Sequence, residues 1–325
     1  MYFGIDLGGT NTAAAVVSGD GTIISRANIH TNTFAGATGV VCGILEACDS
    51  LPAAPGDMPH SIGIGIPGAV DPITGDVLFT PNLPLTGVNI IHEIRKKYDC
   101  PVHIGNDANC AALGEYVAGG MKGVRSAALI TLGTGIGGGL ILGGSLHTGF
   151  SGTGGELGHM VIIAGGRKCG CGRYGCWESY ASASGLIRTA YEFIESHPGS
   201  LLTELCGGNP ETIDGRMVFD AFRAGDTAAR KTVGRYIEHL AAGIVNIINV
   251  LDPEIICVGG GLSNAWDCLF DPLQAAVSAE KFTRRIPTAP QTRIIKAALG
   301  NDAGLIGAAM LGTPEVERGE RRDES

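Results

Sequence analysis

YFGIDLGGTNTAAAVV, residues 2–17, and AALITLGTGIGGGLI, residues 127–141, share one pattern. Each stretch holds an apolar run, a glycine turn that carries a threonine, and a second apolar run. Apolar runs separated by a glycine turn predict two strands joined by a hairpin. Because the pattern occurs twice, we expect an α/β chain with an internal duplication, although the two stretches match in pattern rather than in identity.

The first glycine turn offers backbone N–H groups together with the hydroxyls of Thr10 and Thr12. Such a nest is suited to phosphate oxygens. Asp6 closes the preceding strand and would serve a phosphate site if a divalent cation lay between the carboxylate and the phosphate. A plain hairpin explains this segment equally well when it is considered alone. The second glycine turn supports a phosphate site, because Thr134 lies within it as Thr10 lies within the first turn.

The second turn also contains a G-x-G-x-x-G motif at Gly133, Gly135 and Gly138. That motif indicates a dinucleotide-binding fold only if a helix follows it. An apolar run at 140–142 and a glycine pair follow instead, which favours a second phosphate hairpin over a dehydrogenase. The G-K-[ST] ending of a Walker A loop does not occur in the sequence.

A third group of polar residues, GNDAN at 105–109, stands between a predicted strand at 102–104 and a predicted helix. Asp107 would be a helix N-cap there, since Asp accepts hydrogen bonds from free backbone N–H groups. It would equally be a catalytic carboxylate, because open α/β sheets bind ligands at the carboxyl ends of their strands. Asn106 and Asn109 add more polar groups than one cap needs. Both interpretations stay open on these residues alone.

GGELGHMVIIAGGRKCGCGRYGCWE, residues 154–178, combines two carboxylates, one histidine and three cysteines. The histidine and the cysteines offer a closed tetrahedral ligand set for zinc: His159, Cys169, Cys171 and Cys176. Buried cysteines with an unrelated histidine are the alternative, but core residues would not alternate with glycine, lysine and arginine in this way. Glu156 and Glu178 flank the predicted zinc ligands. We therefore expect the metal to fix this segment so that the two carboxylates can bind a polar molecule.

Two further loops carry weaker signals. Asn82, in the extended loop 80–83, has an amide that could reach a ligand, although a role in capping the loop explains it at least as well. Gly259, Gly260 and Gly261 follow a predicted strand, and three glycines let a flat group such as a purine ring pack against the backbone. A simple tight turn accounts for these glycines equally well.

The composition is that of an ordinary globular chain of 325 residues, 44% hydrophobic and 17% charged, and this length suggests about two domains. A net charge of -9 argues against nucleic acid as a partner, because duplex binding depends on Lys and Arg. We find neither a secretory signal nor an apolar run of about 18 residues, so no membrane partner is expected. Ten cysteines without such a signal favour thiols in a reducing cytoplasm.

Taken together, the motifs resemble the ROK family of sugar kinases and repressors, within the actin-like, hexokinase-like ATPase superfamily, and are most similar to the family's bacterial glucokinases. The resemblance covers about residues 2–312. It rests on DLGGTNT (6–12), GNDAN (105–109), LGTGIGGG (132–139), GELGH (155–159) and CGCGRYGCWE (169–178). None of these motifs departs from the family pattern.

The resemblance implies a two-domain α/β fold of the actin-like, hexokinase-like ATPase type, with a ribonuclease H-like duplication. We expect a small domain at 1–118, to which a helix at 303–312 returns, and a large domain with the zinc site at 119–302. The two domains would close over the substrate and exclude water. The polar tail at 313–325 is expected to be disordered.

The resemblance also implies a role for each matching residue. Asp107 corresponds to the catalytic base that takes a proton from a sugar hydroxyl. The residues that hydrogen-bond the sugar are Asn106, Asp107, Glu156, His159 and Glu178, to which we add Asn82. The nucleotide contacts are Asp6, Gly8, Gly9, Thr10, Thr12, Gly133, Thr134, Gly135, Gly259, Gly260 and Gly261. The zinc ligands are His159, Cys169, Cys171 and Cys176, and the zinc is expected to be structural because four protein ligands leave no open position.

These roles imply the ATP- and Mg2+-dependent transfer of a phosphoryl group to the 6-hydroxyl of a hexose, glucose first among them. Mannose, allose, fructose, N-acetylmannosamine and N-acetylglucosamine are alternative substrates. A sugar-sensing repressor is a further alternative, but the family's repressors carry a winged helix-turn-helix ahead of the first phosphate loop, and Asp6 leaves no room for one. The enzyme is expected to be a cytoplasmic homodimer or higher homo-oligomer.

Overall fold

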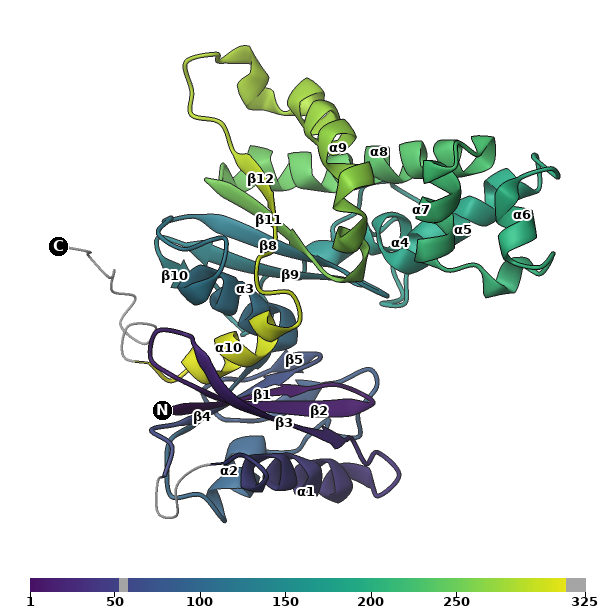
Figure 1. Cartoon of the computed structure of the whole chain (residues 1–325). Coiled ribbons are helices and arrows are strands. Elements are labelled where there is room, and N and C mark those ends of the chain that lie inside the picture. The colour runs from purple at the N-terminus through teal and green to yellow at the C-terminus, as the bar shows by residue number, and fades with distance from the viewer. Residues whose placement is uncertain (53–57, 314–325) are drawn as a thin grey trace. The chain divides into compact units, whose positions relative to one another are not determined.

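The computed structural model describes residues 1–52 and 58–313, which form two compact α/β units (Figure 1). Unit 1 comprises Met1–Leu129, Gly138–Gly155 and Ala297–Ser325, and unit 2 comprises Ile130–Gly137 and Glu156–Lys296. The domain limits expected at residues 118 and 302 stay predictions. The tail expected at 313–325 lies outside the described residues except for Thr313.

The sheet of unit 1 has five strands in the order β3-β2-β1-β4-β7. Its strands are β1 (Tyr2–Leu7), β2 (Asn11–Val17), β3 (Ile23–His30), β4 (Ile62–Ile66) and β7 (Val102–Asn106). Strand β1 pairs antiparallel with β2 and parallel with β4, and β4 pairs parallel with β7. The carboxyl ends of β1, β4 and β7 therefore lie at one edge of the sheet, where Asp6 and Asn106 are found.

Helices cover both faces of this sheet (Figure 1). Helices α1 (Gly36–Asp49) and α2 (Ile90–Arg95) lie on one face, and α3 (Asp107–Ala118) and α10 (Asp302–Met310) lie on the other. Helix α10 comes so close to β1 and β4 that a Cβ at residue 4 or 63 would lie 2.1 or 1.8 Å from a helix carbonyl oxygen. Glycine at both strand positions therefore lets α10 pack directly on the sheet.

A second five-stranded sheet has the order β10-β9-β8-β11-β12. Its strands are β8 (Ala127–Leu132), β9 (Ile136–Leu142), β10 (Ser145–Leu146), β11 (Ile255–Gly259) and β12 (Arg293–Lys296), and the division between the units passes through β8 and β9. Each sheet thus places three consecutive strands on one side and two later strands on the other. This shared order confirms the duplication that the repeated sequence pattern predicts. A small hairpin, β5 (Ala69–Val70) and β6 (Val77–Phe79), belongs to unit 1.

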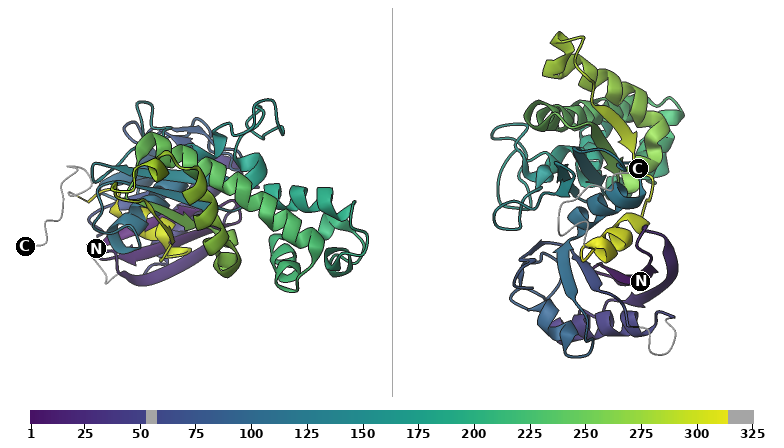
Figure 2. Two further views of the ribbon diagram at one scale, coloured as in Figure 1. Left: turned by 90° about the horizontal axis from the view of Figure 1, so that it is seen from above. Right: turned by 90° about the vertical axis from the view of Figure 1, so that its left-hand side faces the viewer.

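The helices of unit 2 are α4 (Glu178–Ala181), α5 (Ala183–Ile194), α6 (Leu201–Leu205), α7 (Gly215–Arg223), α8 (Thr227–Leu251) and α9 (Trp266–Glu280). The left view in Figure 2 shows α8 as a long helix, and α5, α7 and α9 pack against it. It begins at Thr227, because Asp226 caps it by accepting from the Ala229 amide. The sequence motifs described above indicate none of α6, α7 and β12.

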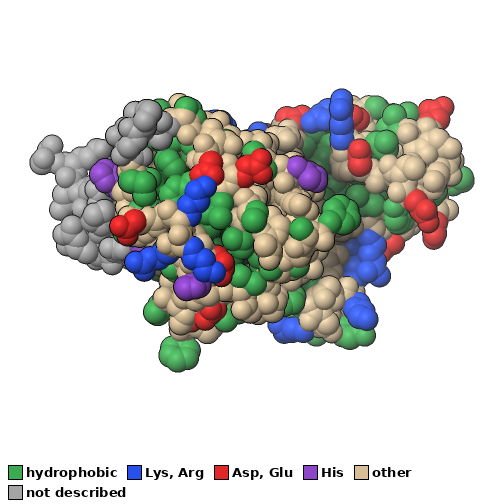
Figure 3. Space-filling model, turned by 90° about the horizontal axis from the view of Figure 1, so that it is seen from below, with side chains coloured by type: hydrophobic (Ala, Val, Ile, Leu, Met, Phe, Trp, Pro, Cys, Tyr) green, Lys and Arg blue, Asp and Glu red, His purple; other side chains and the backbone are tan. Residues whose placement is uncertain are grey.

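Three further observations concern membrane-spanning helices, the cysteines and the charged side chains of the surface. Among residues 1–52 and 58–313, no helix is both long and apolar enough to cross a membrane. Of the seven cysteines outside the predicted zinc set, Cys42 alone is exposed. On the face shown in Figure 3, basic and acidic side chains are interspersed.

Candidate active site

The Asp107 carboxylate lies at the junction of β7 and α3 in unit 1. Asn106 is the N-cap of α3, since its Oδ1 accepts hydrogen bonds from the amides of Ala108 and Asn109 at 2.9 and 3.0 Å. Asp107 is therefore the first residue of the helix rather than its cap. The Asn106 side chain also donates to Asp107 Oδ1 and to the Gly68 carbonyl, each at 3.0 Å. These bonds fix the direction of the Asp107 carboxylate.

Asp6 is a second carboxylate in unit 1, at the carboxyl end of β1. Burial, followed by the negative charge of Asp107, raises the pKa of Asp6 from an ordinary 3.8 to about 6. Helix α10 contributes to this burial, because a Cβ at Gly304 would lie 2.8 Å from the Asp6 carboxylate. Two carboxylates that oppose each other's ionisation are suited to a divalent cation, which would relieve their repulsion.

The first glycine turn joins β1 to β2 and is closed by a hydrogen bond from the Gly8 amide to the Asn11 carbonyl at 2.9 Å. Thr12 is fully buried, and its hydroxyl pairs with Thr31 Oγ1 at 2.9 Å. Thr31 in turn donates to the Gly8 carbonyl at 2.8 Å. The two threonines therefore support the turn from inside, while its tip, Gly9-Thr10, is exposed. Sequence reasoning missed Thr31, because nothing near it in the chain marks this long-range contact.

The second glycine turn, residues 133–135 between β8 and β9, is braced by the start of α5 within unit 2. The Ala183 amide donates to the Gly133 carbonyl at 2.9 Å. Ser184 Oγ donates to the Thr134 carbonyl at 3.0 Å. The helix thus holds two successive carbonyls of the turn, and the Thr134 side chain is exposed. A fixed backbone with an exposed threonine is what a phosphate loop requires.

The Glu178 carboxylate connects this second turn with the predicted zinc ligands. Its Oε2 accepts a hydrogen bond from the Ile136 amide at 3.0 Å, and its Oε1 lies 3.6 Å from Cys169 Sγ. A Cβ at residue 135 would come within 2.4 Å of Oε2, so Gly135 is needed for the carboxylate to reach the turn. Sequence reasoning identified both Glu178 and Gly135 but not their contact.

The four predicted zinc ligands come together in unit 2, with their ligand atoms all within 4.8 Å of one another. The sulfurs of Cys171 and Cys176 lie 3.7 Å apart, and Cys169 Sγ lies 3.7 Å from His159 Nδ1. Zinc bound tetrahedrally at about 2.0–2.3 Å separates its ligand atoms by roughly 3.5–3.8 Å. Both the donor set and the two measured spacings therefore fit zinc.

The protonation of the three thiols depends on their surroundings. Burial raises the pKa of Cys169, and burial together with the two neighbouring thiols raises that of Cys176 to about 12. A hydrogen bond from the Arg173 backbone amide lowers the pKa of Cys171. Metal binding requires thiolates, so a cation bound here must displace protons from the two buried thiols.

Glu156 and His159 are held by a short 3-10 turn, Leu157–His159. His159 directs Nδ1 toward Cys169 and Nε2 toward Glu156, whose Oε2 lies 3.9 Å away. One ring nitrogen is thus placed for a metal and the other faces a carboxylate. Gly158 lets the turn pack on β9, since a Cβ there would lie 2.4 Å from the Ile136 carbonyl oxygen.

Two side chains that sequence reasoning missed fix the segment with the predicted zinc ligands, residues 154–178 (the zinc loop), to the helices of unit 2. Trp177 is fully buried and donates from Nε1 to the His239 carbonyl at 2.8 Å. Its ring fits against α8 because residue 243 is glycine, where a Cβ would lie 2.0 Å from the ring. The Arg167 side chain is only 10% exposed. It donates to Ser179 O, Gly185 O, Thr189 Oγ1 and Glu192 Oε1 at 3.1, 3.3, 3.1 and 2.7 Å.

Asn82 lies exposed in the loop that follows β6 in unit 1. Its side chain makes no hydrogen bond with any residue in the described part of the chain. The loop is closed instead by Thr80, whose hydroxyl donates to the Leu83 carbonyl at 2.6 Å. The capping explanation therefore does not apply to Asn82, and its amide is open to solvent.

The three glycines after β11 differ in their surroundings. Gly259 is buried at the end of the strand. Gly260 has a φ of 81°, and a Cβ there would lie 2.5 Å from the Leu132 amide nitrogen, so a tight turn against β8 accounts for this glycine. Gly261 is exposed and has nothing within 4 Å of the place of a Cβ. Only Gly261 thus leaves open space for a ligand.

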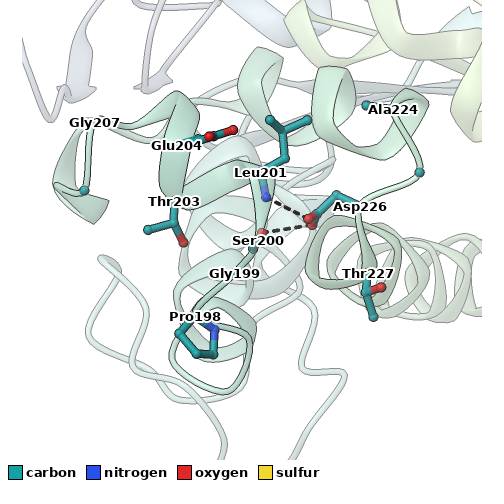
Figure 4. A pocket seen from close by; sticks show the side chains of 12 residues that line it. Pro198, Gly199, Ser200, Leu201, Thr203, Glu204, Gly207, Ala224, Asp226 and Thr227 are labelled. Atoms are coloured by element: carbon teal, nitrogen blue, oxygen red, sulfur yellow. Dashed lines mark hydrogen bonds between the residues drawn. The ribbon is translucent and has the colours of Figure 1, made fainter.

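A pocket of about 810 Å³ lies elsewhere in unit 2, beside α6 and the start of α8 (Figure 4). Asp226 in this pocket accepts hydrogen bonds from Ser200 Oγ at 2.9 Å and from the Leu201 amide at 2.8 Å, in addition to capping α8. Its carboxylate is therefore occupied in holding helix ends. None of the predicted site residues lines this pocket, so it is not part of the candidate active site.

A duplicated α/β fold with two glycine turns, and with a carboxylate at the carboxyl edge of a sheet, is the fold of the actin-like, hexokinase-like ATPases. The ROK family model matches residues 2–314, and the chain belongs to the ROK family.

Individual relatives agree with this assignment. A glucokinase from Streptomyces coelicolor is 37% identical over 313 residues, which are 96% of this chain and 97% of the relative. An N-acetyl-D-glucosamine kinase from Pectobacterium atrosepticum is 31% identical over 326 residues, covering 96% of this chain and 98% of the relative. The solved structure of a ROK family glucokinase from Streptomyces griseus, in complex with glucose and AMPPNP, has a TM-score of 0.78. It is 35% identical and covers 95% of this chain and 98% of that chain.

Proposed function

We propose that the protein is an ATP-dependent hexose kinase that converts glucose to glucose 6-phosphate. Similarity to glucokinases over nearly the whole chain, including one solved with glucose and AMPPNP, is the observation that carries this proposal. The duplicated glycine turns and the fixed Asp107 carboxylate support it independently. A relative at 31% identity is an N-acetyl-D-glucosamine kinase, so an amino sugar is the alternative substrate.

Asp107 is the proposed general base. It accepts the proton of the 6-hydroxyl as the hydroxyl oxygen bonds to the γ-phosphorus of ATP and ADP leaves with the bridging oxygen. An ionised aspartate is a weak base for an alcohol, but in a loose phosphoryl-transfer transition state alignment counts for more than basicity. The hydrogen bond from Asn106 to the Asp107 carboxylate supplies that alignment.

Glu156, His159, Glu178, Asn106 and Asn82 are the proposed contacts of the remaining sugar hydroxyls. Glu178 already accepts from the Ile136 amide, yet a carboxylate offers about four acceptor positions and can bind a hydroxyl as well. Nε2 of His159 is the ring nitrogen proposed to face the sugar, because Nδ1 lies toward Cys169. Carboxylates and an imidazole select a ligand with several hydroxyls over an apolar one.

The two glycine turns and Gly259–Gly261 are the proposed nucleotide contacts. Mg2+ would neutralise charge on the β- and γ-phosphates, and the partly buried Asp6 is the residue proposed to hold it. Structural zinc is proposed on His159, Cys169, Cys171 and Cys176, whose spacing supports it. The expected cytoplasmic location and homo-oligomeric state belong to the same proposal.

A coupled assay of ADP release tests this function. The purified, zinc-loaded protein is given ATP, Mg2+ and in turn glucose, mannose, allose, fructose, N-acetylmannosamine and N-acetylglucosamine. We expect sugar-dependent ADP release that is highest with glucose, and a product with phosphate on the 6-oxygen by NMR. Higher kcat/KM with an amino sugar would reassign the substrate. Folded protein that releases no ADP with any of the sugars would contradict the kinase assignment.

A further inference from the structure

A pocket of about 260 Å³ opens beside the second glycine turn and the start of α5, entirely within unit 2. We call it the α5 pocket. Its lining includes Thr134 from the turn, Ser184 and Arg188 from α5, and Lys168 from the zinc loop. The nucleotide contacts that the family resemblance implies include Thr134, but neither Lys168 nor Arg188.

Both cations of the α5 pocket are available to a ligand. Lys168 and Arg188 are exposed, and neither side chain forms an ion pair or hydrogen bond with any residue of the described chain. This contrasts with nearby Arg167, whose guanidinium is bound by Glu192 and three further acceptors. Two unpaired cations that line one pocket produce a positive potential that favours an anion.

The one carboxylate that lines the α5 pocket does not cancel this charge. Glu178 is turned toward the Ile136 amide and Cys169, at 3.0 and 3.6 Å. It lies beyond ion-pair distance of both Lys168 and Arg188, since neither forms one. The pocket therefore keeps the positive charge of its two cations, while the Glu178 carboxylate is engaged by the Ile136 amide.

The N-terminal end of α5 suits the same chemistry. Helix α5 spans 12 residues, and its first turn, which carries partial positive charge, lines the pocket. The hydroxyls of Ser182 and Ser184 hold this end in place, by capping α5 and by donating to the Thr134 carbonyl. Ser184 and Arg188 stand one turn apart on α5, so they share a face. Lys168 lines the pocket from a loop segment that is fixed by pairing with Tyr174.

We propose that the α5 pocket binds phosphate groups of the phosphoryl donor, with Lys168 and Arg188 as its cationic contacts, so that the zinc loop serves the donor as well as the sugar. The pocket is smaller than the roughly 300–1,000 Å³ of whole-ligand sites, so it takes the phosphate chain rather than the complete nucleotide. The chain has no Walker lysine, and these two residues supply the cations that its glycine turns lack. The inference rests on the proposed kinase function.

Binding of a donor without a base or ribose tests the proposal apart from catalysis. Sodium tripolyphosphate is titrated calorimetrically into the zinc-loaded wild type and into Lys168→Met, Arg188→Met and the double variant. Arg216→Met is the charge-matched control, because Arg216 is 88% exposed on α7 and does not line the pocket. We expect each single variant to weaken binding about 5- to 10-fold, and the double variant about 50-fold. The control should match the wild type.

Steady-state kinetics give the second readout. The KM for ATP should rise by similar factors in the pocket variants, while the KM for glucose and the zinc content stay within about twofold of the wild type. Lys168→Arg and Arg188→Lys should recover most of the ATP affinity, because they keep the charge. Tripolyphosphate affinity that is equal in the wild type, the double variant and Arg216→Met would overturn the α5 pocket as a phosphate site.

The two proposals fail in different ways. If the wild type releases no ADP with any sugar but binds tripolyphosphate through Lys168 and Arg188, the kinase function is wrong and the phosphate site stands. If glucose-dependent turnover is normal and the double variant keeps the wild-type KM for ATP, the kinase function stands and the role of the α5 pocket is wrong.

Discussion

Replacing Asp107 should lower the rate of phosphoryl transfer while leaving sugar binding intact. In Asp107→Asn the new side-chain oxygen can still accept from the Ala108 amide and from Asn106, the bonds that Asp107 Oδ1 makes now. We therefore expect the fold and glucose affinity to survive, while kcat falls by at least about 100-fold, the lower range for loss of a general base. ADP release and calorimetric glucose binding measure the two effects. Turnover within a few-fold of the wild type would remove Asp107 as the base.

Asp6 should make stability depend on pH in the direction opposite to most carboxylates. Its pKa in the folded protein, about 6, exceeds the ordinary 3.8, so the folded state binds more protons between these values. The contribution of Asp6 to stability is fully present below pH 3.8 and is lost as the pH rises through about 6. A shift of this size corresponds to about 3 kcal/mol at most.

As the pH rises from 4 to 7, we therefore expect the free energy of unfolding of Asp6→Asn to increase by about 1–3 kcal/mol relative to that of the wild type. Urea unfolding of both proteins without added Mg2+ or nucleotide measures this difference. Burial lowers the pKa of His239 to about 4 and gives an opposite slope over the same range, but that slope is common to both proteins and cancels. A difference in stability that stays constant from pH 4 to pH 7 would contradict the assigned burial of Asp6.

At the scale of elements, the second glycine turn offers a matched pair of variants. A methyl group at residue 135 would come within 2.4 Å of the Glu178 carboxylate, whereas one at residue 133 meets nothing closer than the Gly135 carbonyl oxygen at 4.0 Å. Gly135→Ala should therefore displace Glu178 from the Ile136 amide. We expect the KM for glucose to rise about 10-fold, the scale of one lost charged hydrogen bond. Gly133→Ala should leave glucose binding unchanged, and equal glucose KM values in the two variants would argue against Glu178 as a sugar contact.

The zinc loop, residues 154–178, is the element whose stability we expect to depend on a bound ion. Cys171→Ser replaces an exposed residue that is a proposed zinc ligand. Because residue 171 lies outside the core, the substitution leaves no cavity there. We expect loss of zinc from the purified protein and a stability lower by several kcal/mol, since structural zinc contributes about 10–16 kcal/mol in isolated zinc peptides. Cys42→Ser, an exposed cysteine on α1, is the control. Metal analysis measures the zinc content, and thermal unfolding measures the stability. A wild type that is fully stable without metal would exclude structural zinc.

At the scale of the whole molecule, the sequence indicates what is local or repeated. The pattern at 2–17 and 127–141 predicts β1, β2, β8 and β9, and the two sheets have the same strand order. The short spacing among Cys169, Cys171 and Cys176 likewise predicts the ligand cluster. Both succeed because the residues concerned are close in the chain or arranged in a regular repeat.

What the sequence does not indicate depends on contacts that are distant in the chain. Helix α6 has five residues and β12 four, so neither is long enough to show a period. Thr31 under the first turn and Arg167 behind the zinc loop are fixed by partners elsewhere in the fold. That Asn106 rather than Asp107 caps α3 is likewise shown by the structure alone, and the role of Asp107 as a base stays a prediction.

Glu115 is a further residue of this kind, and it bears on how the chain passes between the units. Its side chain is fully buried in unit 1, and its carboxylate accepts hydrogen bonds from the amides of Gly120, Ala298 and Leu299 at 2.8, 3.2 and 2.7 Å. Gly120 lies on the segment by which the chain leaves α3 for unit 2. Ala298 and Leu299 lie on the segment by which it returns. One carboxylate thus fastens both segments to unit 1.

We expect Glu115→Gln to loosen both segments at once. A carboxamide nitrogen cannot accept a hydrogen bond, so at least one of the three amides loses its partner in a buried site, and stability should fall by about 2–4 kcal/mol. Hydrogen exchange should also quicken at residues 119–121 and 297–299 but not in α8. Exposed Glu280→Gln on α9 is the control. If exchange at both segments stays at the wild-type rate while stability falls, Glu115 is only a packing residue, and the passage of the chain between the units must be held by other contacts.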